Sequence, residues 1–227
     1  MANTLFTNRS GGKSVGPFAS KNLALHVGDD RDCVLENRAL LSKEIGIAPD
    51  RIFYMNQVHG ANIVTIDNSS DVSVPPTADG LFTELNGIAL AVLTADCSPL
   101  LLYSETAIAA VHIGRKGLIA GALEAAFDKF NQLGIPPREV LAEIGPAICR
   151  DCYQIDLASY REFVNVAPSA GSDEDMRCVD VSLAIAAKLD RLGVTYKKSN
   201  ICVSHAPGFF SYRRDGITGR QAGVIWL

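Results

Sequence analysis

Residues 90–103 read LAVLTADCSPLLLY, an apolar run that carries an acid and a thiol, Asp96 and Cys97, at its centre. Short apolar segments rich in Leu, Val and Ala predict buried strands. We expect one strand at 88–94 and a second at 100–103. Because Pro99 restricts the conformation of the residue before it, the run is broken between the two strands, and Cys97 emerges just after the first.

The rest of the chain mixes strands with helices. Further strands are predicted at 51–58, 61–66, 107–113, 140–144, 200–203 and 221–227. Apolar residues at helical spacing predict helices at 33–45, 118–133, 157–166 and 181–192. Asp32 and Asp180 are the expected N-terminal caps of two of them. Three predicted strands follow one another from Ile88 to Ile113 without a helix between them, so the elements do not alternate as in a doubly wound sheet. We therefore expect an α/β (α+β) fold built of layers, with mixed or antiparallel sheets.

Composition limits the class of protein. The chain has 227 residues, 48% of them hydrophobic, and a net charge of −4. This length supports a buried core, and the charge provides no basic field for nucleic acid or a membrane surface. The first residues, MANTLFTNRSGG, are polar where a secretory signal needs an apolar core. We expect a cytoplasmic protein with reduced cysteines, folded as a single domain over residues 1–227, because no repeat or linker divides it.

Three soft ligands are predicted to lie at strand ends. His59 precedes Gly60 after one strand, Cys97 follows another, and His112 closes a third. Two imidazoles and a thiolate suit zinc, and a catalytic zinc takes three protein ligands and leaves one position open. The other interpretation is that the thiol is a small core residue and the imidazoles are hydrogen-bonded helpers. The long separations between the three residues leave both interpretations open.

Several motifs match one known family along essentially the whole chain. They are FTNRSGG, GPFASKNLALHVGDD, NQVHGANIV, ADGLFT, LTADCSPLLLY, AAVHIG, IGPAI and FFSYRRDGITGRQAGVIWL. In these the sequence resembles the YfiH family, also known as the laccase-domain or multicopper polyphenol oxidase family. The resemblance implies a layered α-β-β-α sandwich with mixed sheets. It also implies His59, Cys97 and His112 as ligands of a zinc ion.

The resemblance implies an enzyme as well. Members of the family are described as zinc-dependent purine nucleoside phosphorylases that accept adenosine, inosine, guanosine and methylthioadenosine and also deaminate adenosine. Purine nucleoside and phosphate are therefore the expected small-molecule partners. Cys97 and Asp96 are the expected catalytic residues, with Asp96 as the candidate acceptor of a proton from zinc-bound water because it is adjacent to Cys97 in the sequence. The matched motifs also suggest four residues that contact substrate: Arg9, Asp79, Lys116 and Arg213.

Two motifs depart from the family pattern. After His112 the family usually reads HAGWRG, whereas this chain reads HIGRKG. Lys116 thus replaces a planar, bidentate arginine with a point charge. The usual IGPxIGPCCYEV is IGPAICRDCYQI here, with Cys149 as an extra cysteine. These changes concern substrate affinity and leave the three expected metal ligands unchanged.

Other activities are alternatives on the same residues. The four histidines are too few for the trinuclear copper cluster of a laccase, although copper bound at the same three ligands would allow weak oxidase activity. No histidine begins the HxE motif of cytidine-type deaminases. Without metal, Cys97 as nucleophile and His112 as base would make a hydrolase, and editing of peptidoglycan precursors is a further role linked to the family. A metal-stabilised scaffold ranks last.

The remaining cysteines and histidines receive no catalytic role. Cys149 and Cys152 have CxxC spacing, which is weak evidence for zinc without a second pair. Packing roles are expected for Cys33, Cys178 and Cys202. A structural hydrogen bond is expected for His26, and His205 has no match to the family.

Overall fold

The apolar run at residues 90–103 contributes to two strands that belong to different sheets. In the computed structural model, which describes residues 2–227, β5 (Ala89–Thr94) lies in a four-stranded sheet and β6 (Ser98–Tyr103) in a six-stranded one. Only residues 95–97 connect them, and Asp96 turns the corner with a φ of 104°. Cys97 therefore leaves the first sheet at the point where the chain enters the second.

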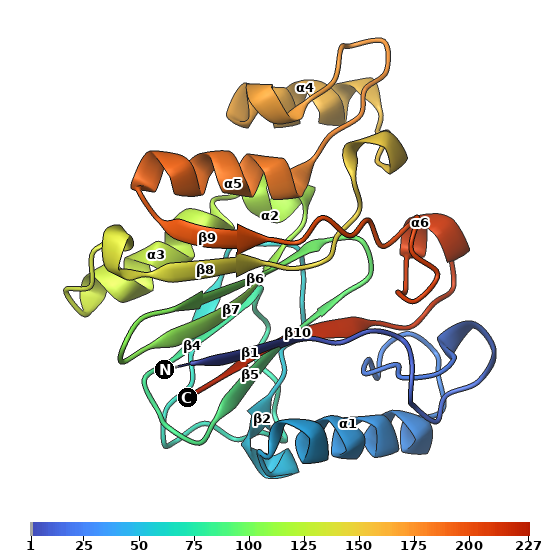
Figure 1. The fold of residues 1–227 in the computed structure, drawn as a ribbon, viewed down its shortest axis with the longest axis vertical. Coiled ribbons are helices and arrows are strands. Elements are labelled where there is room, and N and C mark those ends of the chain that lie inside the picture. Colours follow the sequence, from blue (N-terminus) through green and yellow to red (C-terminus); the bar gives the residue numbers. More distant parts are fainter. Residues whose placement is uncertain (1) are drawn as a thin grey trace.

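Both sheets are mixed, as expected. The first has the order β1-β10-β5-β2, with β1 (Asn3–Phe6), β10 (Gln221–Trp226) and β2 (Ile52–Phe53), and only β2 runs parallel to its neighbour. The second has the order β3-β4-β7-β6-β8-β9, formed with β3 (Ile63–Thr65), β4 (Gly80–Thr83), β7 (Ile108–Ile113), β8 (Leu141–Ile144) and β9 (Thr195–Lys198). Because β1 pairs with β10, the two ends of the chain lie side by side (Figure 1).

Six α-helices are found among residues 2–227. They are α1 (Arg31–Ile45), α2 (Arg115–Ile119), α3 (Ala122–Gln132), α4 (Leu157–Val166), α5 (Val181–Leu192) and α6 (Tyr212–Asp215). Short 3-10 helices are η1 (Gly16–Phe18), η2 (Pro49–Arg51), η3 (Pro137–Glu139), η4 (Arg150–Cys152) and η5 (Pro168–Ala170). Within this part of the chain, none of the helices has the length and apolar character needed to cross a lipid bilayer.

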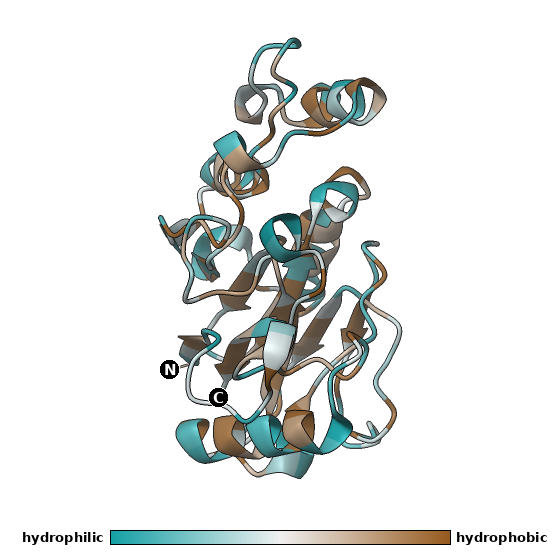
Figure 2. Cartoon of the chain, turned by 90° about the vertical axis from the view of Figure 1, so that its right-hand side faces the viewer, coloured by the Kyte–Doolittle hydropathy of each residue, from teal (hydrophilic) through white to brown (hydrophobic). Residues whose placement is uncertain are grey.

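The layers explain why the central strands are apolar without interruption. On β5, Ala91 and Leu93 pack on the α1 side of the four-stranded sheet, whereas Leu90 and Val92 point between the two sheets. On β7 the alternate residues face the helices α2, α3 and α5. Strands covered on both faces need no polar side. Figure 1 shows α1 outside one sheet, α2, α3, α4 and α5 beyond the second, and α6 at one end of the sandwich. Figure 2 shows the strands mostly brown between helices of mixed colour. The expected α-β-β-α sandwich is confirmed.

The helix predictions are partly corrected. The helices 157–166 and 181–192 are confirmed, and the Asp180 carboxylate caps α5 by accepting from the Leu183 amide. The single helix expected at 118–133 is instead two helices, because Gly121 has a φ of 88°. The cap of α1 is Asp30 instead of Asp32, since its carboxylate accepts from the backbone amides of Asp32 and Cys33.

Several strand predictions are wrong at the edges of the sheets. The strand expected at 51–58 is reduced to β2, and 200–203 forms only an isolated bridge at Cys202. β9 forms one edge of the six-stranded sheet. Its residues are largely exposed, and it pairs with β8. An edge strand of this kind lacks the continuous apolar pattern that predicts a buried strand. β1 and β4 have only four residues each and were not predicted.

Candidate functional site

Three segments meet at one end of the sandwich and bring His59, Cys97 and His112 together. One ring nitrogen of each histidine and the cysteine Sγ all lie within 4.8 Å of one another. The two imidazole rings are nearly perpendicular, with centroids 4.8 Å apart. His112 has the strand parity of Ile108 and Ala110, so it points between the two sheets. We call these three residues the triad; the sequence singled out all three.

Asp79 positions two members of the triad, His59 and His112, through hydrogen bonds. Its carboxylate accepts hydrogen bonds from the backbone amides of Val58, His59 and Gly60, at 3.2, 2.8 and 2.6 Å, and lies 2.8 Å from Nδ1 of His112. The first three bonds fix the turn in which His59 has a φ of 63°. The fourth bond occupies Nδ1 and leaves Nε2 of His112 for the triad, an arrangement typical of metal-binding histidines.

The expectation that Asp79 contacts a substrate does not fit its position. The side chain is 0% exposed, and its hydrogen bonds all go to groups of the protein that it orients. Burial alone would raise the pKa of Asp79, but hydrogen bonds from His112 and from the Gly60 amide lower it below its ordinary value. Asp79 is therefore an ionised positioning group beneath the triad.

The triad provides a thiolate at neutral pH. Burial raises the pKa of the Cys97 thiol, but the charge and hydrogen bond of His112 and the hydrogen bond of His59 outweigh it and bring the pKa to about 6. Burial lowers the pKa of His112, and Cys97 and Asp79 raise it to about 9. A ligand set that already holds a thiolate fits a divalent metal ion, because metal binding requires the deprotonated thiol.

Gly114 leaves room for the triad. A Cβ at this position would lie 2.9 Å from the Cys97 Sγ and 3.2 Å from Cδ2 of His59. Both contacts are tighter than side chains normally make, so Cys97 or His59 would have to move.

The substitution Gly114→Ala is expected to weaken metal binding at the triad by about tenfold or more, the effect typical of disturbing ligand orientation. Competition with a chromophoric chelator measures this affinity. Gly208→Ala is the matched control, because a Cβ at Gly208 meets nothing within 4 Å. Equal affinities of the two variants would show that Gly114 does not shape the site.

A cavity of about 620 Å³ adjoins the triad. Its volume is in the range of small-molecule sites. It is lined by His26, Gln57, His59, Leu93, Thr94, Ala95, Asp96, Cys97, His112, Gly114, Arg115, Lys116, Ile148, Tyr153, Val181, Tyr212, Arg213 and Arg220. Among the expected substrate residues, Lys116 and Arg213 line this cavity.

Arg9, an expected substrate contact, does not line the cavity. Its Nε donates to the Ala19 carbonyl at 2.6 Å, and its guanidinium lies over the Phe210 ring at 4.7 Å from the centroid. These contacts give it a structural role in the N-terminal segment.

Asp96 lines the cavity, but both of its carboxylate oxygens already accept hydrogen bonds from the protein. One carboxylate oxygen accepts from the Ser211 hydroxyl at 2.6 Å, and the other accepts from the Arg213 amide at 2.7 Å. These bonds fix the beginning of α6 and with it the backbone position of Arg213. The geometry supports a positioning role for Asp96, and its role as a proton acceptor stays a prediction.

Four basic side chains line the cavity, and sequence reasoning identified only two of them. We call Arg115, Lys116, Arg213 and Arg220 the basic rim. Arg220 lies in the matched motif FFSYRRDGITGRQAGVIWL, and Arg115 lies beside Lys116 in HIGRKG, where the chain departs from the family; these positions were the available signal. The Arg213 guanidinium lies 5.2 Å from the centroid of the Tyr153 ring. A rim of this composition favours an anionic ligand.

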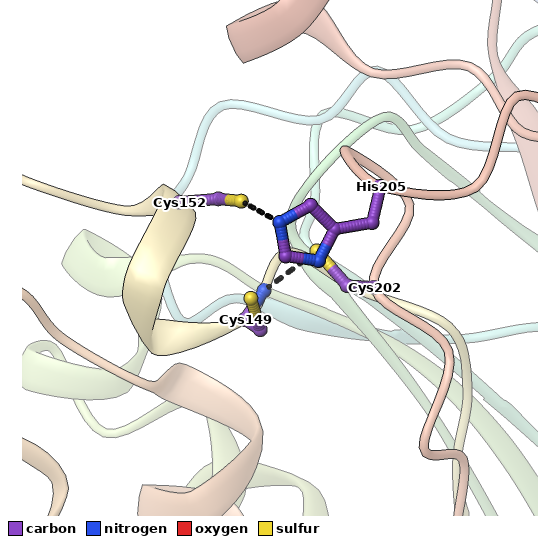
Figure 3. A group of neighbouring side chains, drawn as sticks. All are labelled: Cys149, Cys152, Cys202 and His205. Carbon is purple, nitrogen blue, oxygen red and sulfur yellow. Dashed lines mark hydrogen bonds between the residues drawn. The ribbon is translucent and has the colours of Figure 1, made fainter.

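The fold brings together a second set of side chains of the kind that bind metals, which the sequence did not indicate as one site. Cys149, Cys152, Cys202 and His205 have their ligand atoms within 4.8 Å of one another, and Figure 3 shows them converging from two segments. We call them the Cys3His cluster. The prediction that Cys202 only packs does not fit this position. Sequence spacing did not reveal the cluster, because its two pairs are far apart in the chain.

Comparison with known proteins gives consistent matches over the whole chain. Residues 3–227 match the family described as multi-copper polyphenol oxidoreductase laccase. Purine nucleoside phosphorylase SCO2081 of Streptomyces coelicolor is 41% identical over 227 residues, 98% of this chain and 94% of that protein. Purine nucleoside phosphorylase ORF3 of Streptomyces griseus is 39% identical over 233 residues, 100% of this chain and 94% of the relative.

Solved structures share the fold. The crystal structure of NMB0706 from Neisseria meningitidis has a TM-score of 0.87 and 34% identity, covering 100% of this chain and 94% of that one. YlmD from Geobacillus stearothermophilus has a TM-score of 0.91 and 32% identity, covering 99% of this chain and 91% of its own. The similarity therefore extends from the sequence to the arrangement of both sheets.

Proposed function

Since the chain belongs to the family described as multi-copper polyphenol oxidoreductase laccase, and its relatives include named purine nucleoside phosphorylases, we propose that it cleaves purine nucleosides by phosphorolysis. In this reaction a phosphate oxygen forms a bond to C1′ of the ribose, and the bond from C1′ to the purine nitrogen breaks. The purine leaves with the bonding electrons and takes up a proton. The products are the free base and ribose 1-phosphate.

The observation that carries this proposal is the basic rim beside the triad. Arg115, Lys116, Arg213 and Arg220 surround a cavity large enough for a nucleoside. Phosphorolysis requires an anionic nucleophile held close to a neutral sugar, so positioning and charge stabilisation account for most of the catalysis. Arg213 is held for this task by the bond of its amide to Asp96 and by the Tyr153 ring beneath its guanidinium.

His59, Cys97 and His112 are the residues that would hold zinc. Three N and S ligands form the protein part of a catalytic zinc site. A zinc ion bound there would supply Lewis-acid chemistry to a substrate in the cavity. The chain's own contribution is to keep the thiolate and both imidazoles in place through Asp79 and the space at Gly114.

The aromatic part of the lining supports a broad range of purine substrates as part of the proposal. Tyr212 is 61% exposed at the cavity and Tyr153 lies deeper under Arg213. Stacking on an aromatic ring accepts any purine, because every base has a π-face. We therefore include adenosine, inosine, guanosine and methylthioadenosine as substrates.

Deamination of adenosine is the second proposed activity. It requires water to attack C6 of the purine, a group that accepts the proton of that water, and cleavage of the bond from C6 to the amino nitrogen, which takes up a proton and leaves as ammonia. Asp96 borders the cavity directly beside Cys97, and each of its oxygens accepts one protein hydrogen bond and keeps a further lone pair. This activity does not need phosphate, which separates it from phosphorolysis in an assay.

The test is incubation of the protein with inosine or adenosine, with and without phosphate, followed by separation of the products. Hypoxanthine or adenine released only with phosphate, together with ribose 1-phosphate, supports phosphorolysis. Inosine formed from adenosine without phosphate supports deamination. If neither nucleoside is converted under either condition by protein loaded with zinc, the proposed function is wrong.

Replacing Arg213 by alanine is expected to raise the KM for phosphate by about tenfold or more. A hydrogen bond to a charged group contributes about 1.5–3 kcal/mol, and tenfold in affinity is about 1.4 kcal/mol. Initial rates at saturating inosine and varied phosphate measure the effect. Arg138→Ala is the control, because the Arg138 side chain is 75% exposed and lies outside the cavity lining. An unchanged KM in the Arg213 variant would remove Arg213 from the phosphate site.

A further inference from the structure

The Cys3His cluster is made of two pairs with the same spacing. Cys149 and Cys152 form a CxxC pair around η4, and Cys202 and His205 form a CxxH pair in the turn after β9. Figure 3 shows the four side chains directed toward a common centre. Two such pairs, each on a tight turn, are the usual way in which a chain presents four ligands to one metal ion.

The backbone fixes the two turns against each other. Ala147 and Cys202 form a parallel bridge, and the Val203 amide donates to the Ala147 carbonyl at 3.1 Å. The Cys149 amide donates to the Cys202 Sγ at 3.3 Å. An amide that donates to sulfur favours the thiolate form and orients it. The ligand positions are thus set by main-chain contacts that do not depend on a metal.

The separations suit a tetrahedral ion. Zinc bonds of about 2.3 Å to sulfur and about 2.0–2.1 Å to nitrogen place tetrahedral ligand atoms about 3.5–3.8 Å apart. The Cys152 Sγ and His205 Nε2 are 3.0 Å apart, and no pair of ligand atoms in the cluster exceeds 4.8 Å. The observed separations bracket the tetrahedral ones, so small side-chain rotations complete the geometry.

We propose that Cys149, Cys152, Cys202 and His205 form a second, structural zinc site. Four N and S ligands fill the coordination of zinc and leave no position for substrate, in contrast to the three ligands of the triad. Three thiolates also disfavour magnesium and calcium, which prefer oxygen ligands. Binding displaces the thiol protons, and zinc with three thiolates and a neutral imidazole has a net charge of −1. The Arg214 guanidinium, which donates to the Val203 carbonyl at 2.8 Å, lies beside this charge.

Zinc bound in the Cys3His cluster would fix the position of one wall of the cavity. Ile148 and Tyr153 flank the CxxC pair directly, and both line the cavity. Arg214 donates to the Ser204 and Ala206 carbonyls at 3.3 and 3.2 Å, which connects the CxxH turn to α6. A zinc ion in the cluster therefore holds the segments that carry Tyr153 and Arg213. Its effect on catalysis is through position only.

The test is the zinc content of the purified protein, measured by native mass spectrometry and elemental analysis. The wild type is expected to hold two zinc ions per chain. Cys202→Ala and His205→Ala are expected to hold one, Cys97→Ala also one, and Cys33→Ala two, because Cys33 belongs to neither group. In protein loaded with cobalt, the intense sulfur-to-metal absorption is expected to persist in Cys97→Ala and to fall strongly in Cys202→Ala.

Two outcomes would overturn the proposal. One is a wild type in which all bound zinc is lost with Cys97→Ala. The other is an intact mass that shows a disulfide among the cluster cysteines in freshly purified protein. If the cluster variants fail to fold, Cys97→Ala alone decides, because a folded Cys97→Ala protein that holds no zinc contradicts the proposal. None of these readouts depends on phosphorolysis, so failure of the proposed zinc site can be distinguished from failure of the proposed function.

Discussion

Replacing Cys97 by alanine is expected to lower kcat/KM for inosine phosphorolysis by about a thousandfold or more, which is about 4 kcal/mol of transition-state stabilisation. Cys97 provides the only thiolate of the triad and lies with both imidazoles around one point. Without it two neutral ligands remain, and a zinc ion would bind weakly. The side chain is small and only half-buried, so the fold is expected to survive.

The control for this experiment separates two explanations of the same loss. Cys33→Ala removes a thiol outside the triad and is expected to retain wild-type kcat/KM. Wild-type protein stripped of metal by a chelator is expected to lose activity and to regain it with added zinc. If the stripped protein stays active and one equivalent of iodoacetamide inactivates it, Cys97 is a nucleophile instead of a metal ligand.

The layers of the fold were predictable because their cause is local. Strands such as β5 and β6 are buried on both faces, so each shows as a continuous apolar run. β9 is different, because its residues are mostly exposed and its strand conformation comes from pairing with β8. A pattern that reports burial does not report edge pairing, which is why the sequence favours a strand at 200–203 and none at β9.

The site shows the same division between local and distant causes. Cys97 and His112 could be predicted because they follow β5 and lie near the end of β7, where side chains of a rigid scaffold project. His59 follows no strand in the structure, and the family motif NQVHGANIV indicated it instead. The roles of Asp79 and Asp96 could not, since both depend on backbone amides that reach them only in the folded protein. The Cys3His cluster depends likewise on the bridge between Ala147 and Cys202. Position and family motifs therefore indicated the triad ligands, but neither the Cys3His cluster nor the contacts that orient the triad.

The second large effect is expected from Asp79→Ala. The substitution leaves the amides of His59 and Gly60 and the Nδ1 of His112 without their acceptor in a fully buried place. Removing one partner of a buried charged pair typically costs about 3–5 kcal/mol. For a chain of this size, about 3 kcal/mol corresponds to a fall of about 6–12 °C in Tm. Thermal unfolding of the metal-free protein measures this part of the effect.

Asp79 is also expected to control metal affinity, which a purely structural residue would not. With Asp79 absent, His112 is free to rotate or to present Nδ1, and loss of such a partner typically weakens metal binding about 10–100-fold. Asp79→Asn retains an oxygen and much of the shape, so it is expected to unfold at a higher temperature than Asp79→Ala while still binding zinc weakly, because its amide cannot accept from all the donors. Asp128→Ala, an exposed aspartate on α3, controls for loss of charge. A folded Asp79→Asn variant with wild-type zinc affinity would limit Asp79 to stabilising the turn at His59.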